Sequence, residues 1–275
     1  MDADLSRQAH LTHISTLWTV VRNAHGADET TARTAQARLI ERYSPAVYRY
    51  LLAVLRDEHA ADEVFQEFAV RLLRGGFVGA DPTRGRFRDY LKTAILHLVT
   101  DFRRGAARRR RERPFEAESQ IPAAPGPGLG PAPGPGPAPG SGVDADDRLF
   151  LHSWREALLG RAWDALATHE AESKQPLYQV LRLRSEHAGA DSEQLAATLT
   201  QRLSPARPFT AAYVRKVLQR ARGMFAEVLV AEVAHSLASP TQAEIEQELI
   251  DLSLHAYCRS AVRRTGARAA ASREP

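Results

Sequence analysis

Acidic and amide side chains gather in one short segment of the chain. Apolar spacing predicts a helix over residues 58–74, and Asp62, Glu63, Gln66 and Glu67 lie close together within it. Spacings of three and four residues put Glu63 with Gln66 and Glu67 on one exposed face. Such a face is either solvated or a docking surface for a basic partner. No histidine stands at a spacing useful for acid–base chemistry, and no glycine-rich phosphate loop or nucleophile turn occurs, so we expect no enzyme.

A second set of residues combines aromatic and basic side chains. The next predicted helix, residues 87–104, begins with Phe87, Arg88, Tyr90 and Lys92, and it runs into seven arginines within residues 103–113, among them Arg103, Arg104, Arg108 and Arg109. Aromatic rings beside cations can stack an unpaired base while the cations hold phosphates. Phe87 and Tyr90 suit a buried core equally well. The density of arginines favours phosphate contact over a solubilising tail.

A third set lies in residues 192–222, where a short helix, a turn and a longer helix resemble a helix-turn-helix. No acidic residue occurs between residues 194 and 226. A basic stripe of this kind on the second helix is what a reader of the major groove needs. Its candidate contacts are Arg215, Lys216, Gln219, Arg220 and Arg222.

The elements that position these sets are all predicted to be helices, because alternating β-branched residues are nearly absent. Helices are expected over 31–56, 58–74, 87–104, 147–169, 174–187, 210–236 and 241–257, with Ser192 capping one more. Ser44-Pro45 is expected to cap or kink the first. Residues 121–142 hold eight prolines, seven glycines and no charge, which predicts a disordered linker.

The fold class is therefore all-α, with two helical domains joined by this linker. We expect an N-terminal segment at 1–30, a helical domain at 31–113 and a flexible linker at 114–146. A helix-turn-helix domain at 147–236 and a C-terminal helical extension with a basic tail at 237–275 complete the chain.

Charge and cysteine content narrow the function classes. Residues 1–113 hold 20 Lys/Arg and 14 Asp/Glu, a balance of +6, whereas residues 143–258 hold 12 and 16, a balance of −4. A local basic patch is therefore more plausible than a chain that coats nucleic acid throughout. Cys258 is the single cysteine, and no zinc pattern occurs, so no metal or cofactor is expected. Without a signal peptide or a long apolar run, a cytoplasmic protein with no membrane contact is expected.

Taken together, these segments resemble the sigma-70 family of bacterial RNA polymerase sigma factors, in its extracytoplasmic-function (ECF) group. Residues 61–67, ADEVFQE, are similar to the family's A-x-D-x-x-Q-E motif, with Glu63 where Asp is usual. The stretch GRFRDYLKTAILHLVTDFRR resembles the F-R-x-W-L…D-x-x-R helix, with Tyr90 in place of Trp. SEQLAATL and YVRKVLQRAR resemble parts of the fourth region, with Val217 where a basic residue is usual.

The resemblance implies a DNA-binding protein that associates with core RNA polymerase and directs promoter recognition, DNA opening and transcription initiation. It implies that Asp62, Glu63, Gln66 and Glu67 bind the clamp helices of the β′ subunit. The aromatic and basic residues of 87–109 would open the −10 element. The helix-turn-helix would read the −35 element and touch the β flap, and an anti-sigma factor is a further candidate partner.

Two other functions fit parts of the pattern. A helix-turn-helix regulator could bind duplex DNA without polymerase, but it has no use for the acidic face of residues 60–67. A helical adaptor that binds only protein would show weak DNA binding that is insensitive to salt. Residues 223–258 extend beyond the usual end of the family. They either pack on the second domain or form a built-in regulatory segment that covers the DNA-binding face.

Overall fold

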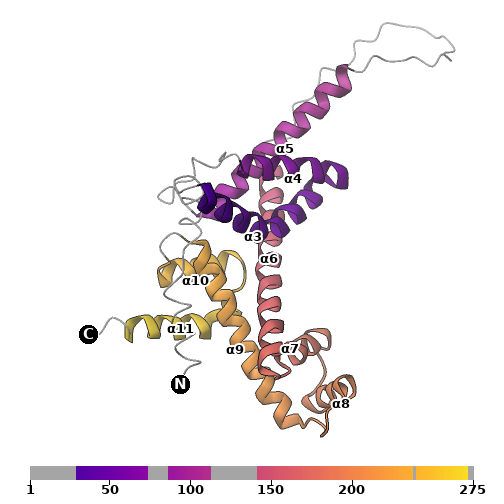
Figure 1. The fold of residues 1–275 in the computed structure, drawn as a ribbon, viewed down its shortest axis with the longest axis vertical. Coiled ribbons are helices and arrows are strands. Elements are labelled where there is room, and N and C mark those ends of the chain that lie inside the picture. Colours follow the sequence, from indigo (N-terminus) through magenta and orange to yellow (C-terminus); the bar gives the residue numbers. More distant parts are fainter. Residues whose placement is uncertain (1–28, 74–85, 113–140, 238–239, 272–275) are drawn as a thin grey trace, which may run out of the picture.

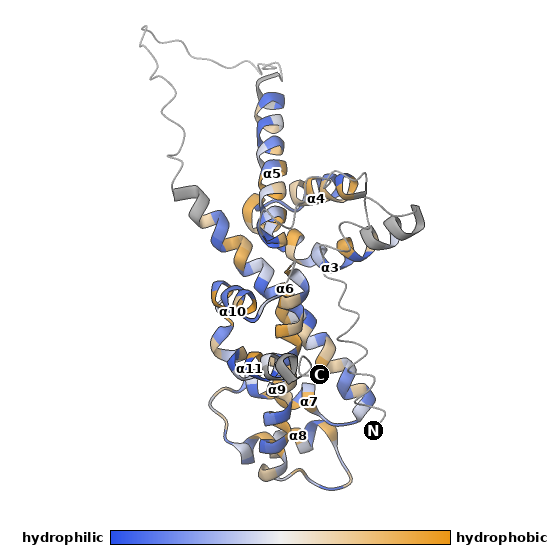
Figure 2. Cartoon of the chain, turned by 90° about the vertical axis from the view of Figure 1, so that its left-hand side faces the viewer, coloured by the Kyte–Doolittle hydropathy of each residue, from blue (hydrophilic) through white to orange (hydrophobic). Residues whose placement is uncertain are grey.

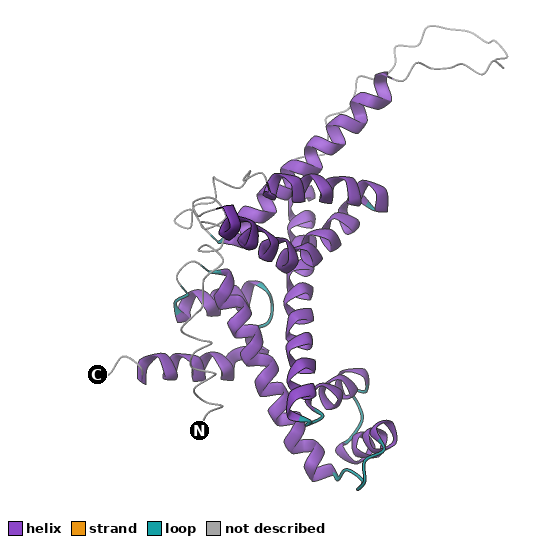
Figure 3. Cartoon of the chain, in the orientation of Figure 1, coloured by secondary structure: helices purple, strands orange, loops and turns teal. Residues whose placement is uncertain are grey.

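The computed structural model describes residues 29–73, 86–112, 141–237 and 240–271, which form helices and short turns without a strand among them (Figure 1; Figure 3). The all-α fold class is confirmed. Segment 1–28, loop residues 77–85 and linker residues 114–140 lie outside the described ranges. The helices are α3 (Glu29–Leu55), α4 (Glu58–Leu73), α5 (Phe87–Glu112), α6 (Ser141–Ser173), α7 (Leu177–Glu186), α8 (Ser192–Leu203), α9 (Ala211–Ser236), α10 (Gln242–Asp251) and α11 (His255–Ala271).

Helices α3, α4 and α5 share an apolar centre. Their buried side chains recur at helical spacing, as the sequence predicts, and include Val47, Tyr50, Phe68, Leu91 and Ile95. Pro45 lies inside α3 and does not start a helix there. The neighbouring Ser44 hydroxyl donates a hydrogen bond to the Ile40 carbonyl oxygen at 2.6 Å, so α3 continues through this position.

Helix α6 runs along the molecule and packs against both α3 and α9 (Figure 1). It begins at Ser141, earlier than the predicted residue 147. In its first half, Trp154 stacks on Tyr43 of α3, with ring centroids 5.0 Å apart and ring planes 11° from parallel. In its second half, Trp163 meets Phe225 of α9 at a centroid distance of 4.7 Å. The first half of α6 therefore helps to enclose the core of α3–α5. The packing is continuous across residue 147, where the sequence predicts the second domain to begin.

An ion-pair group reinforces this junction. Glu232 of α9 accepts hydrogen bonds from Arg42 of α3, at 2.7 Å, and from Arg161 of α6. Arg161 also donates to the Arg42 carbonyl oxygen at 3.0 Å. One carboxylate thus joins three helices that are far apart in sequence.

Helices α8 and α9 are the expected short and long helices on either side of a turn, and α7 packs against both of them. The N-cap of α8 is Asp191 rather than Ser192, because the Asp191 carboxylate accepts from the backbone amides of Glu193 and Gln194, and Gln194 bonds back in a capping box. Thr210 caps α9. The long turn between them is held by a hydrogen bond from the Phe209 amide to the Thr200 hydroxyl at 2.9 Å.

The C-terminal extension is two helices, not the single helix predicted over 241–257. Helix α10 ends at Asp251, Ser253 takes a left-handed φ of 58°, and α11 starts at His255. A left-handed backbone position is usually marked in a sequence by glycine, and residue 253 is a serine. The apolar helical spacing also continues through it, so the sequence predicted one helix. Leu249 and Cys258 are fully buried, so both helices pack onto the rest of the described structure.

Replacing Trp154 with Ala is expected to lower the free energy of unfolding by about 3–5 kcal/mol, because a fully buried aromatic side chain is removed from a close-packed core. Urea unfolding followed by circular dichroism measures this change. Leu149→Ala is the matched control on the same helix, since Leu149 is 38% exposed, and it should cost less than about 1 kcal/mol. Equal losses for the two variants would contradict the role given to α6.

Candidate functional site

The outer surfaces of α4 and α5 form a groove with a cavity of about 430 Å³. Glu63, Gln66 and Glu67 are exposed along its α4 side. The remaining lining is partly apolar and comes from both helices: Val64, Val70, Arg71, Leu98, Asp101 and Phe102. An apolar floor beneath an acidic rim suits a basic, amphipathic helix from a partner.

Asp62 is placed differently from the other three predicted residues of α4. Its carboxylate accepts a hydrogen bond from the Tyr48 hydroxyl of α3 at 2.8 Å, and this bond raises the pKa of Tyr48. Asp62 therefore ties α4 to α3, whereas Glu63, Gln66 and Glu67 lie together at the groove. Glu67 also pairs with Arg71 one turn later, at 2.7 Å.

The two aromatic residues at the start of α5 differ in exposure. Phe87 is 4% exposed, and its ring lies 5.0 Å from that of Tyr43. It shares the inward face of α5 with Leu91 and Ile95, so in this structure it belongs to the core and is not open to a base. Tyr90 is half-buried against the core, and its burial raises the pKa of the hydroxyl.

The basic residues near the start of α5 are held by acidic residues from later helices. Lys92 pairs with Asp147 of α6 at 3.1 Å. Arg88 is buried and donates to Glu248 of α10 at 2.8 Å. Its neighbour Arg86, which the sequence reasoning did not single out, donates to the same carboxylate at 2.7 Å.

The second carboxylate of α10 completes this contact. Asp251 accepts from Arg86 and, at 3.4 Å, from Arg88. Burial raises the pKa of Glu248 against the opposing effect of the arginines. Burial also acts to raise the pKa of Asp251, but hydrogen bonds from Gln247 and Arg86 lower it overall. Glu248 and Asp251 are three residues apart and therefore share one face of α10. This spacing was the sequence signal that could have predicted a basic contact for α10.

The later arginines of α5 lie on a different part of the surface. The helix continues to Glu112, beyond the predicted residue 104, and its end projects away from α3 and α4 (Figure 2). Arg104, Arg108 and Arg109 are exposed there. Arg103 is exposed as well, and it donates to the Val54 carbonyl oxygen at 3.3 Å. This projecting end presents positive charge at a distance from the α10 contact.

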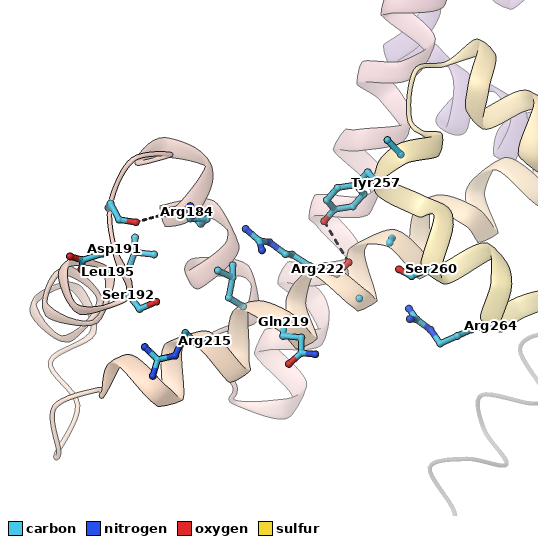
Figure 4. Close-up of a pocket in the computed structure, with 15 residues that line it drawn as sticks. Arg184, Asp191, Ser192, Leu195, Arg215, Gln219, Arg222, Tyr257, Ser260 and Arg264 are labelled. Carbon is cyan, nitrogen blue, oxygen red and sulfur yellow. Dashed lines mark hydrogen bonds between the residues drawn. The ribbon is translucent and has the colours of Figure 1, made fainter.

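The five predicted residues of α9 are all exposed, but they divide between two directions. Arg215, Gln219 and Arg222 line a cleft of about 1020 Å³ between α7–α9 and α11 (Figure 4). Arg220 instead bonds to Gln175 at 3.3 Å, and Lys216 does not line the cleft. Val217 is buried, which explains why an apolar residue stands there.

The cleft is rich in guanidinium groups. Arg184 of α7 and Arg264 of α11 add to Arg215 and Arg222, and sequence reasoning missed both additions (Figure 4). The one carboxylate in the lining, Asp191, is engaged in capping α8. The cleft can therefore attract the phosphates of a nucleic acid backbone.

In the part of the chain that the structure describes, no group of three or more His, Cys, Asp or Glu side chains is arranged to hold a metal ion. Within the same ranges, every helix is too short or too polar to cross a membrane.

Replacing Glu248 with Ala is expected to cost about 3 kcal/mol of stability, because Arg88 then stays buried without its closest carboxylate. Urea unfolding of the full chain measures the loss. Glu246→Ala on the same helix is the control, since the Glu246 carboxylate bonds only to Gln242 among the described residues, and its effect should stay below about 1 kcal/mol. A loss for Glu248→Ala as small as that of the control would contradict the importance of this pair.

Comparison with known proteins gives a match for helices α3, α4 and α5. Residues 39–109 match the family model described as Sigma-70 region 2. The match starts on α3, includes the whole of α4 and ends on α5, so it contains both the groove and the start of α5. No curated protein and no solved structure matched the chain. The similarity to sigma-70 region 2 therefore covers the helices that form the groove and the start of α5.

Proposed function

We propose that this chain is an ECF-type sigma factor that binds core RNA polymerase, recognises and opens promoter DNA, and starts transcription in the bacterial cytoplasm. The observation that carries the proposal is the region 2 match over the residues that form the α4–α5 groove. The protein acts by binding, and the proposal includes no catalytic step, metal or cofactor.

The groove between α4 and α5 is the proposed polymerase contact. Glu63, Gln66 and Glu67 supply acceptors and negative charge at its rim, and Val70 is an exposed apolar side chain beside them. The β′ clamp helices would lie across this groove. Asp62 would contribute by holding α4 in place through Tyr48.

The α5 helix is the proposed contact with the opened −10 element. Taking a base out of the DNA stack costs a few kcal/mol, which aromatic stacking and phosphate contacts can offset. Tyr90 is half-buried at the start of this helix, whereas Phe87 lies in the core. The exposed Arg104, Arg108 and Arg109 would hold the backbone of a separated strand.

The helix-turn-helix of α8 and α9 is the proposed reader of the −35 element, and it would also touch the β flap. Arg215, Gln219 and Arg222 share one exposed face of α9 and line the basic cleft. Side chains at the N-terminal part of a recognition helix reach base edges, while flanking arginines position the backbone.

Glu63→Arg/Gln66→Ala is expected to reduce binding to core RNA polymerase by at least about tenfold, because a basic partner then meets a positive charge at the groove rim. A pull-down of core polymerase with the tagged full chain measures this. Glu172→Arg is the matched control, since Glu172 is also exposed but lies on α6, outside both proposed polymerase contacts. Wild-type protein that fails to retain polymerase would refute the sigma-factor proposal.

Arg215→Ala/Arg222→Ala is expected to weaken binding to a short labelled DNA duplex. The slope of log K against log salt concentration should become shallower by about 1.8, at about 0.9 for each lost phosphate contact. Fluorescence anisotropy at several salt concentrations gives both quantities. Arg38→Ala/Arg49→Ala removes two exposed arginines from α3 and should leave the slope unchanged. An equal change of slope in both pairs would show a general charge effect only.

The two assays also separate the alternative functions. Duplex binding without polymerase binding would favour a helix-turn-helix regulator. Polymerase binding together with weak, salt-insensitive DNA binding would favour a helical adaptor.

A further inference from the structure

Helix α10 covers the start of α5 with two carboxylates. In Figure 1, α10 lies beside α9 and below the group formed by α3, α4 and α5. Its buried residues Ile245 and Leu249 anchor it by apolar contact. Glu248 and Asp251 reach Arg86 and Arg88, which precede them by about 160 residues in the chain.

The contact is buried at its centre. Arg88 is 5% exposed and Glu248 is 1% exposed, with their charged groups 2.8 Å apart. Glu248 receives a second hydrogen bond from Arg86 at 2.7 Å through its other oxygen. Both oxygens of one carboxylate are thus engaged by two separate guanidinium groups.

The carboxylates do not satisfy Arg88 completely. The Arg88 Nε atom is buried and has no hydrogen-bond acceptor, although Asp89 lies 3.5 Å away as an ion pair. A guanidinium presents its five N–H donors in a planar fork that fits carboxylate and phosphate alike. A backbone phosphate, like a carboxylate, presents two anionic oxygens and can therefore meet the same donors.

Arg86 and Arg88 also lie where a nucleic acid strand would meet the region 2 domain. Both are within the matched residues 39–109, next to Tyr90 at the start of α5. Helix α10 has only ten residues, which is too short for an isolated helix to be stable in water. Its position therefore depends on the contacts it makes, including these ion pairs.

We propose that Arg86 and Arg88 form a binding site for the backbone phosphates of single-stranded DNA, and that Glu248 and Asp251 of α10 occupy this site in place of phosphate. DNA and α10 compete for the two arginines. The identity of the ligand rests on the proposed function, since a sigma factor must hold a separated strand. The C-terminal extension then limits DNA binding by the region 2 domain until it is displaced.

Glu248→Gln/Asp251→Asn tests this competition in the full chain. The variant keeps the size of both side chains but removes their charge, and it replaces one acceptor oxygen of each with an NH2 donor. We expect its affinity for a fluorescein-labelled single-stranded oligonucleotide of mixed sequence to rise about tenfold. We expect the slope of log K against log salt concentration to steepen by about 1.4, since two additional phosphate contacts contribute about 0.7 each.

Two controls separate competition from a change in overall charge. Glu172→Gln/Glu246→Gln removes the same charge from α6 and α10 without touching Arg86 or Arg88, and it should change affinity less than twofold. Adding Arg86→Ala/Arg88→Ala to the test variant should abolish its gain. A gain that survives loss of both arginines, or one matched by the control pair, would overturn the proposal.

A folding defect in the double variant does not end the test. Asp251→Asn alone changes a side chain that is 30% exposed, and it should give a smaller gain that also depends on Arg86 and Arg88. No gain in a folded single or double variant would mean that the α10 contact is only structural.

The polymerase pull-down, run on the same protein, distinguishes this failure from that of the proposed function. Polymerase binding without a DNA gain would refute the competition and leave the sigma-factor proposal standing. A gain in DNA affinity without polymerase binding would refute the sigma-factor proposal and leave the competition standing.

Discussion

The packing of α6 between α3 and α9 is the constraint on which the rest of the described structure depends. Trp154 stacks on Tyr43 at one point of the helix, and Trp163 meets Phe225 further along. Stacked and tilted aromatic pairs at these distances add to the burial of large apolar areas. Because α6 closes the core of α3–α5 and also packs against α7 and α9, the two groups of helices are held by one continuous helix.

This arrangement decides which candidate surfaces are open. The groove of α4 and α5 lies away from the α10 contact, and Glu63, Gln66 and Glu67 remain exposed. The start of α5 faces the C-terminal helices, and Arg88 is buried there by Glu248. A polymerase contact through α4 therefore needs no rearrangement of α10, whereas a phosphate contact through Arg88 does.

The fold class and most helix limits follow from apolar spacing, because helices α3, α4 and α9 each bury one regular stripe. The sequence could not place Ser253, whose left-handed backbone breaks an otherwise helical pattern. It also left Phe87 open between core and base contact, because an aromatic ring beside arginines fits both environments. Arg86, Arg184 and Arg264 were missed because their importance arises from partners more than 30 residues away in the chain or from a shared cleft, which local spacing does not report.

The opposite charge balances of the two halves acquire a physical meaning in the structure. The acidic residues of the second half include Asp147, Glu232 and Glu248, and each pairs with a basic residue of the first half. These pairs differ in their sensitivity to salt, because the partly exposed Lys92–Asp147 pair is screened more than the buried Arg88–Glu248 pair. The aromatic contacts of α6 involve no charge, so an anion can displace α10 from Arg86 and Arg88 while α6 stays in place. Exchange of α10 for DNA would then open the region 2 surface without separating the two groups of helices.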